Sequence, residues 1–179
     1  TQIADAAMDI AQGNLRTALP EISGHDEMRT LHDSFANMQQ SLLRYIDELK
    51  VSTASKERIE SELRIARSIQ MGMVPKIFPP FPEREDVDLY AKLCPAREVG
   101  GDLYDFFIED EKLYFIIGDV SGKGVPASLV MAVTCRLFRT IASYITTPEG
   151  IVSTLNEALS ESNESNMFCT FFIGIFDLN

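Results

Sequence analysis

The stretch EVGGDLYDFFIEDEKLYFIIGDVSGKG, residues 98–124, decides the fold of this chain. It contains two turns that combine glycine with aspartate, GGD at 100–102 and GDVSGKG at 118–124, and an apolar run between them that is typical of a β-hairpin. Each turn adjoins residues with strand character. We therefore expect Asp102 and Asp119 at the ends of two strands.

These two aspartates are candidate metal ligands. Neighbouring strands lie about 4.8 Å apart, so a hairpin would bring Asp102 and Asp119 side by side. Two close carboxylates repel each other, and a divalent cation removes that cost. The carbonyl of Val120 is a further oxygen donor, and an all-oxygen site favours magnesium, manganese or calcium over zinc. Two ordinary tight turns remain the alternative on these residues alone.

Composition limits the possible partners. The chain has 179 residues, a formal net charge of -11 and a pI near 4.6, so its average field repels nucleic acid and anionic lipid. Cys94, Cys135 and Cys169 lack CxxC spacing, which argues against a zinc knuckle or a disulfide framework. We expect buried thiols in a reducing compartment.

The N-terminal third has helical periodicity. A helix over residues 1–12 should end at Gly13, and a connector at 15–24 precedes a second helix that begins near Asp26. That helix repeats apolar residues at alternating spacings of three and four, which predicts a seam for a partner helix. The seam comprises Met28, Leu31, Phe35, Met38, Leu42, Tyr45 and Leu49.

Polar Ser52 and Lys56 interrupt this seam before a helix over 57–73 resumes it. They indicate either a weak point in a signal-transmitting helix or simply a frayed, solvated stretch. The proline-rich segment that follows places a domain boundary between Met73 and Asp86.

The second half predicts an α+β domain. Strands are expected at 87–94, 104–108 and 112–120 as an antiparallel meander, then helices at 126–145 and 148–159. A long buried strand at 167–178 should complete the sheet.

Three further candidates are rejected. GDVSGKG is one residue short of a phosphate loop, and Ser121 lacks the GxSxG pattern of a nucleophile elbow. His25 and His32 are expected to be solvated or to pack against the connector.

Four motifs carry a family resemblance. ELRIARSIQMGMVP at 62–75, PAREVGGDLYDFF at 95–107, GDVSGKGVPASLVMA at 118–132 and MFCTFFIGIFDL at 167–178 closely resemble the bacterial PPM-type metal-dependent serine/threonine phosphatases of the SpoIIE/RsbU-like branch. Residues 3–49 resemble a HAMP signalling module without the start of its first helix.

The resemblance implies an α/β-β/α sandwich with a two-metal site for manganese or magnesium. Asp102 and Asp119 match the first two ligand aspartates, and Val120 donates its carbonyl. The implied reaction is hydrolysis of phosphoserine or phosphothreonine on a partner regulatory protein, often an anti-sigma-factor antagonist. No separate catalytic side chain is assigned.

We expect a HAMP-type module at 1–50, a coiled-coil linker at 51–75 and the N-terminal part of a phosphatase domain at 76–179. Later ligand aspartates would lie beyond Asn179, so this stretch alone is expected to be inactive. The resemblance also implies a homodimer through the HAMP and linker helices, in the cytoplasmic portion of an inner-membrane protein whose transmembrane segment is absent here. The alternative is a non-catalytic, dimeric signalling protein with a degenerate phosphatase-like region.

Overall fold

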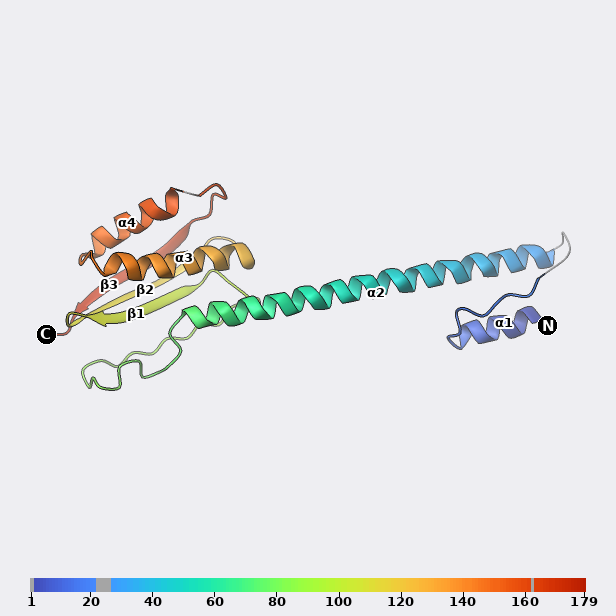
Figure 1. Ribbon diagram of the computed structural model, residues 1–179, viewed down its shortest axis with the longest axis horizontal. Coiled ribbons are helices and arrows are strands. Elements are labelled where there is room, and N and C mark those ends of the chain that lie inside the picture. The colour runs from blue at the N-terminus through green and yellow to red at the C-terminus, as the bar shows by residue number, and fades with distance from the viewer. Residues whose placement is uncertain (1, 22–26, 162) are drawn as a thin grey trace. The chain divides into compact units, whose positions relative to one another are not determined.

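The computed structural model describes residues 2–21, 27–161 and 163–179. It contains two compact units, Thr1–Glu60 and Ser61–Asn179, and combines helices with one antiparallel sheet, as the predicted α+β class requires (Figure 1). The elements are α1 (Gln2–Ala11), α2 (Glu27–Met73), β1 (Leu103–Glu109), β2 (Lys112–Val120), α3 (Val125–Ala142), α4 (Pro148–Ser160) and β3 (Cys169–Asp177).

The first unit contains α1, the connector and the first part of α2. Helix α1 ends before Gly13, whose φ of 103° is the left-handed conformation that glycine favours. The connector is tied to α2 by one side chain, because the Gln39 amide donates to the carbonyls of Leu15 (2.9 Å) and Thr17 (2.7 Å). His25 lies outside the described residues, and His32 lies against the neighbouring Asp33.

Helix α2 is unbroken through residues 51–56, so this stretch is solvated but not frayed. Its predicted seam remains largely uncovered in the single chain. Six of its side chains are between 39% and 63% exposed: Met28, Leu31, Met38, Leu42, Tyr45 and Leu49. An apolar stripe of this kind is what a partner helix would cover.

The second unit is built on the β1–β2 hairpin. Asp110 and Glu111 form its two-residue turn, and both have positive φ (49° and 56°), as a type I′ turn requires. The turn sets an antiparallel register that runs from Glu109↔Lys112 to Leu103↔Gly118. Strand β3 pairs antiparallel with the other side of β2, giving the order β1-β2-β3.

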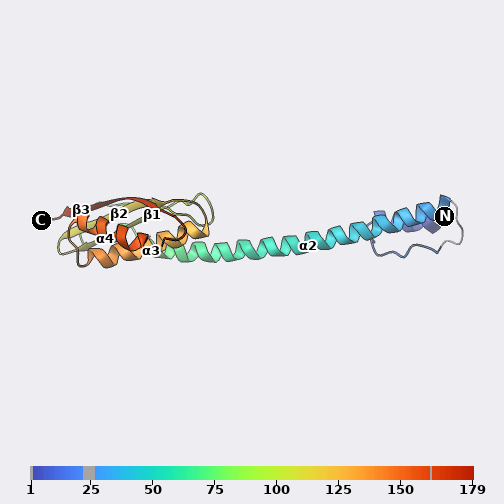
Figure 2. The same cartoon turned by 90° about the horizontal axis from the view of Figure 1, so that it is seen from above.

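Helices α3 and α4 cover one face of this sheet (Figures 1 and 2). By length and composition α3 could also span a membrane, but here its apolar face is packed into the core, where Phe138 and Met131 are fully buried. Helix α4 begins as predicted, with the Thr147 side chain accepting a hydrogen bond from the Gly150 N–H.

An ion pair fixes α3 to β1. The Asp105 carboxylate is only 2% exposed and accepts from Arg139 Nε and Nη2, each at 2.6 Å. Arg139 also donates to the carbonyl of Phe106 and lies over the ring of Phe107. The buried charge of Asp105 is therefore compensated by a bidentate partner.

The opposite sheet face is covered beside β1 and open beside β3. Phe78 and Phe81 pack on Phe106, and the Tyr104 hydroxyl donates to the carbonyl of Pro75 at 2.6 Å. The strand predicted at 87–94 is absent: this segment is irregular, although alternate side chains do turn inward. The alternation of apolar and polar residues correctly predicted which side chains point inward. A strand also needs hydrogen bonds to a neighbouring strand, and this segment does not form them.

Strand β3 is not the buried strand that its composition predicted. Phe172 and Phe176 are 63% and 60% exposed, and Ile173 is its one buried residue. Gly174 leaves room for the ring of Phe115 from β2, which would clash with any Cβ there. Only the helix-facing side of β3 is covered by the described residues.

We predict that Arg139→Leu destabilises the protein by about 3 kcal/mol, because it leaves the buried Asp105 carboxylate without its partner. The free energy of unfolding from urea titration measures this. Arg136→Leu, one turn earlier on the exposed side of α3, should change it by less than about 0.5 kcal/mol. Equal losses in the two variants would contradict the role of the ion pair.

Candidate metal centre

The hairpin register places Asp102 opposite Asp119. Leu103 pairs with Gly118, so one further step along both chains sets the two aspartates directly across from each other on the same face. Asp119 belongs to β2, and Asp102 immediately precedes β1. The pKa of Asp102 is raised by partial burial, and then by the charge of Asp119 and a hydrogen bond with it. The two carboxyl groups thus lie in contact, as the sequence predicted.

A backbone contact between Gly101 and Val120 holds the two chain segments together next to Asp102 and Asp119. The Val120 N–H donates to the carbonyl of Gly101 at 3.3 Å. A Cβ added to Gly101 would lie 2.6 Å from the Val120 oxygen, which is closer than real contacts allow. Gly101 is therefore required for the close approach of the chain at Val120, the third predicted donor.

Strand β3 supports Asp119 and the loop after it. The Thr170 hydroxyl donates to the Asp119 carbonyl at 3.3 Å. Ser121 exchanges two hydrogen bonds with Phe168, in which its N–H donates at 2.7 Å and its hydroxyl accepts at 2.9 Å. Ser121 thus has a structural role, consistent with its rejection as a nucleophile.

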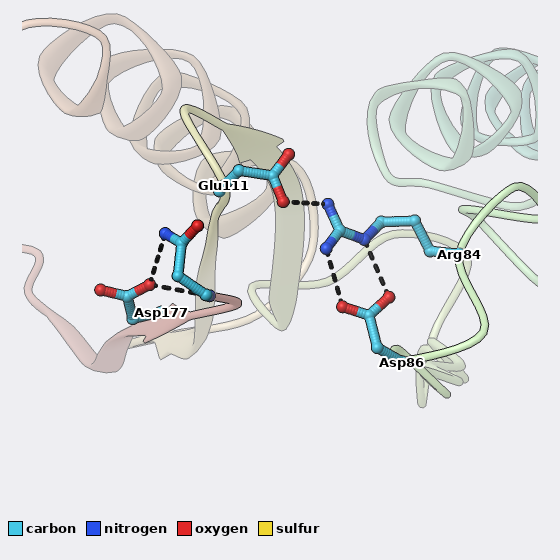
Figure 3. A network of polar contacts seen from close by, with 5 residues as sticks. Arg84, Asp86, Glu111 and Asp177 are labelled. Atoms are coloured by element: carbon cyan, nitrogen blue, oxygen red, sulfur yellow. Dashed lines mark hydrogen bonds and ion pairs between the residues drawn. The ribbon is translucent and has the colours of Figure 1, made fainter.

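Among the described residues, no further acidic or sulfur ligand is gathered with Asp102 and Asp119. Asp177 pairs with Lys112 at the far end of β2, and its pKa is lowered by hydrogen bonds from Asn179 (Figure 3). Burial raises the pKa of Cys169 to about 11 and that of Cys135 to about 12, so both are neutral thiols. Cys94, expected to be buried, is exposed.

Figure 3 also shows that Arg84 binds two acids near the hairpin turn, Asp86 and Glu111. Arg84 donates to both carboxylate oxygens of Asp86 and to Glu111 at 2.7 Å. These hydrogen bonds lower the pKa of Asp86 and raise that of Arg84. The network joins the segment before β1 to the hairpin turn, at the opposite end of the hairpin from Asp102.

The donor set fits a hard divalent cation. It offers two adjacent carboxylates and nearby backbone carbonyls, with no soft ligand committed to the site. Among the residues that the structure describes, no group of three or more histidine, cysteine, aspartate or glutamate side chains is gathered. Two carboxylates are fewer than a complete metal shell, so a cation bound at Asp102 and Asp119 would need further ligands.

Comparison with known sequences identifies the two parts of the chain. The family described as Stage II sporulation protein E (SpoIIE) matches residues 109–179, and the HAMP domain matches residues 1–44. Residues 109–179 are thus similar to the SpoIIE family and residues 1–44 to HAMP domains, as the resemblance indicated.

Two relatives and one solved structure extend this match. The phosphoserine phosphatase RsbU of Bacillus subtilis is 28% identical over 124 residues, covering 69% of this chain and 36% of RsbU. Protein IcfG of Synechocystis is 25% identical over 205 residues, covering 97% of this chain and 31% of IcfG. The chain thus spans about a third of the length of these relatives.

The SiaA-PP2C domain of Pseudomonas aeruginosa shares the fold with a TM-score of 0.53 at 21% identity. The match covers 66% of this chain and 49% of that domain.

Sequence reasoning missed the residues that support the aspartates. Thr170 contacts Asp119 only because β3 pairs with β2, a pairing of distant segments, and the same pairing brings Phe168 to Ser121. Gln70 is buried against Gly100. The sequence did indicate this burial, because position 70 continues the helical spacing of the apolar residues Leu63 and Ala66 but holds a polar residue.

A matched pair of glycine variants tests the geometry. Gly101→Ala should lower the affinity for Mn²⁺ at least about tenfold, because the new methyl group forces the chain away from Val120 and misplaces Asp102. Gly100→Ala should leave the affinity unchanged, since its nearest atom would be 3.8 Å away. Calorimetric titration of the intact protein measures both. If the two variants bind Mn²⁺ equally well, the close approach of Gly101 to Val120 does not determine the position of Asp102.

Proposed function

We propose that this chain is the cytoplasmic part of a signal-regulated, metal-dependent protein-serine/threonine phosphatase. The observation that carries the proposal is the position of Asp102 opposite Asp119, beside the close contact of Gly101 with Val120. The SpoIIE match and the name of RsbU, a phosphoserine phosphatase, support the reaction class.

Asp102, Asp119 and the Val120 carbonyl would hold manganese or magnesium as part of a two-metal site. When bound, such ions lower the pKa of water and neutralise charge on phosphoryl oxygens. The protein's own contribution is positional: the hairpin holds two carboxylates at one place on the sheet surface. The substrate would be a phosphorylated regulatory protein, such as an anti-sigma-factor antagonist.

The N-terminal unit would supply the regulation. HAMP domains commonly dimerise and usually belong to membrane-linked sensors, which supports a homodimer through α2 and a membrane tether outside this chain. The uncovered stripe from Met28 to Leu49 offers the dimer surface. We keep the proposed division into a HAMP-type module at 1–50, a linker at 51–75 and a phosphatase region at 76–179.

A non-catalytic signalling role is the second candidate. It is favoured by the small acidic set at the site, since the described residues bring together two carboxylates and no third. In this case the phosphatase-like region would bind a partner without hydrolysing it. Activity of the intact protein separates the two candidates.

Asp119→Asn tests the catalytic proposal. In the intact protein it should lower manganese-dependent release of phosphate from a phosphoserine protein by at least about 100-fold, because a direct ligand is lost. Asp177→Asn is the matched control, since Asp177 ends its strand at the other end of the sheet and should not affect turnover. Turnover that needs no metal would contradict the proposal, and absence of any turnover would favour the non-catalytic role.

Sedimentation tests the dimer. The intact protein, or its cytoplasmic part, should sediment as a dimer at tens of micromolar, and Leu42→Lys should shift it toward monomer by placing a charge in the seam. Ser41→Lys, on the neighbouring exposed position, should leave the dimer intact. If the unmodified protein is a strict monomer at that concentration, the prediction that the seam forms a dimer interface is wrong.

A further inference from the structure

A hollow of about 500 Å³ lies between α3, α4 and the chain that enters β3. Helix α3 packs on β1 and β2, whereas α4 packs on β3, and the hollow lies where these two contacts diverge. Its volume is within the range of small-molecule binding pockets, about 300–1,000 Å³. All three elements supply its apolar lining, which includes Leu129, Val130, Val133, Leu159, Met167 and Phe171.

The walls of this hollow leave large apolar side chains uncovered. Leu129 and Val133, one turn apart on α3, are 63% and 51% exposed, and Phe168 on the facing wall is 65% exposed. The core side of the same helix is closed, since Met131 is fully buried. A concave apolar surface of this kind gains free energy when a ligand removes it from water.

The chemistry of the lining selects for an uncharged ligand. Charged residues make up 24% of the chain, yet no charged side chain lines the hollow among the described residues. A charged ligand would lose its hydration here without a counter-charge. The net charge of -11 disfavours an anion further.

The polar groups of the lining lie at its rim. Asn156, Ser160 and Ser165 are exposed, and among the described residues their side chains have no hydrogen-bond partner in the protein. Asn163 differs, because its amide donates to the Met167 carbonyl at 2.6 Å and accepts from the Met167 N–H at 2.9 Å. One wall is therefore held in shape by Asn163, and the rim can bind a hydroxyl group.

The hollow also adjoins the glycine-rich loop that follows β2. Phe168 exchanges two hydrogen bonds with Ser121 of that loop, at 2.7 and 2.9 Å. Cys169, another lining residue, pairs with Val120 at the end of β2, and Pro126 lines the hollow just after the loop. An occupant would therefore contact the residues that hold both ends of this loop.

We propose that this hollow binds a small uncharged molecule that has an apolar body and a hydroxyl head. The body lies against the apolar lining, and the head binds at the polar rim. The site is on the helix-covered side of the sheet, whereas Asp102 and Asp119 face the other side. Binding therefore does not need the metal, and the inference goes beyond the proposed phosphatase reaction.

The test compares two probes of equal chain length, 1-octanol and octanoate, by calorimetric titration of the metal-free protein. 1-Octanol should bind at one saturable site with a dissociation constant of about 1 mM or tighter. Octanoate should bind at least about tenfold more weakly, because its carboxylate has no counter-charge in the hollow.

Variants locate the site. Val133→Asp places a charge on the wall at an exposed position, where folding tolerates it, and should weaken 1-octanol binding at least about tenfold. Thr140→Asp is the matched control, because Thr140 is exposed on the same helix outside the hollow. Phe172→Ser removes an aromatic ring from the open sheet face and should leave 1-octanol binding unchanged.

Amide hydrogen exchange gives a second readout. Saturating 1-octanol should slow exchange at Ser121 and Phe168, whose N–H groups carry the hydrogen bonds between the wall and the loop. Exchange in α1 should stay unchanged.

The outcomes are distinct. Absence of saturable 1-octanol binding, or equal binding of 1-octanol and octanoate, overturns the proposed site. Loss of binding in Phe172→Ser with unchanged binding in Val133→Asp would place the probe on the open sheet face and also overturns it. Because no metal is present, each of these results leaves the proposed phosphatase function standing.

Discussion

The register of one β-hairpin is the constraint on which the second unit depends. It is set by the turn at Asp110 and Glu111, where both residues have positive φ. Side chains alternate between the sheet faces with a period of two, so a slip of one residue would reverse every face. It would also remove Asp102 from its place opposite Asp119, about eight residues from the turn along each strand.

The same alternation gives Asp102, just before β1, and Asp105, within it, opposite roles. Asp102 and Asp105 are three positions apart and therefore point to different faces. Asp105 lies under α3, is buried, and is compensated by Arg139. Asp102 faces away from the helices beside a second carboxylate, and among the described residues no cationic side chain is paired with it. Asp105 therefore stabilises the fold, whereas Asp102 lies beside Asp119 without such a cationic partner.

Local signals in the sequence were sufficient for much of the fold. Gly13 and the Thr147–Pro148 pair mark helix ends, and the two glycine-aspartate turns predicted the hairpin and the contact of Asp102 with Asp119. Features that depend on distant partners were not predictable in this way. The segment 87–94 has strand periodicity without a ladder, and the aromatic residues of β3 lie on a face that the described residues leave uncovered.

At Gln70 the spacing of apolar residues indicated a buried position, but it did not predict the partners of the polar side chain. The apolar register of α2 passes through position 70, where a polar residue must find partners, and a sequence alone does not say which backbone will supply them. The structure supplies Gly100. Polar residues at expected core positions are thus useful indicators of a site's supporting contacts.

The facing carboxylates also have a thermodynamic consequence. A metal that binds only the folded hairpin stabilises it by mass action, by about 2.7 kcal/mol when the free ion is at 100 times its dissociation constant. Without the ion, the folded chain retains the repulsion between Asp102 and Asp119. The supply of divalent cations would then govern how much of this protein is folded, as well as how fast any folded molecule works.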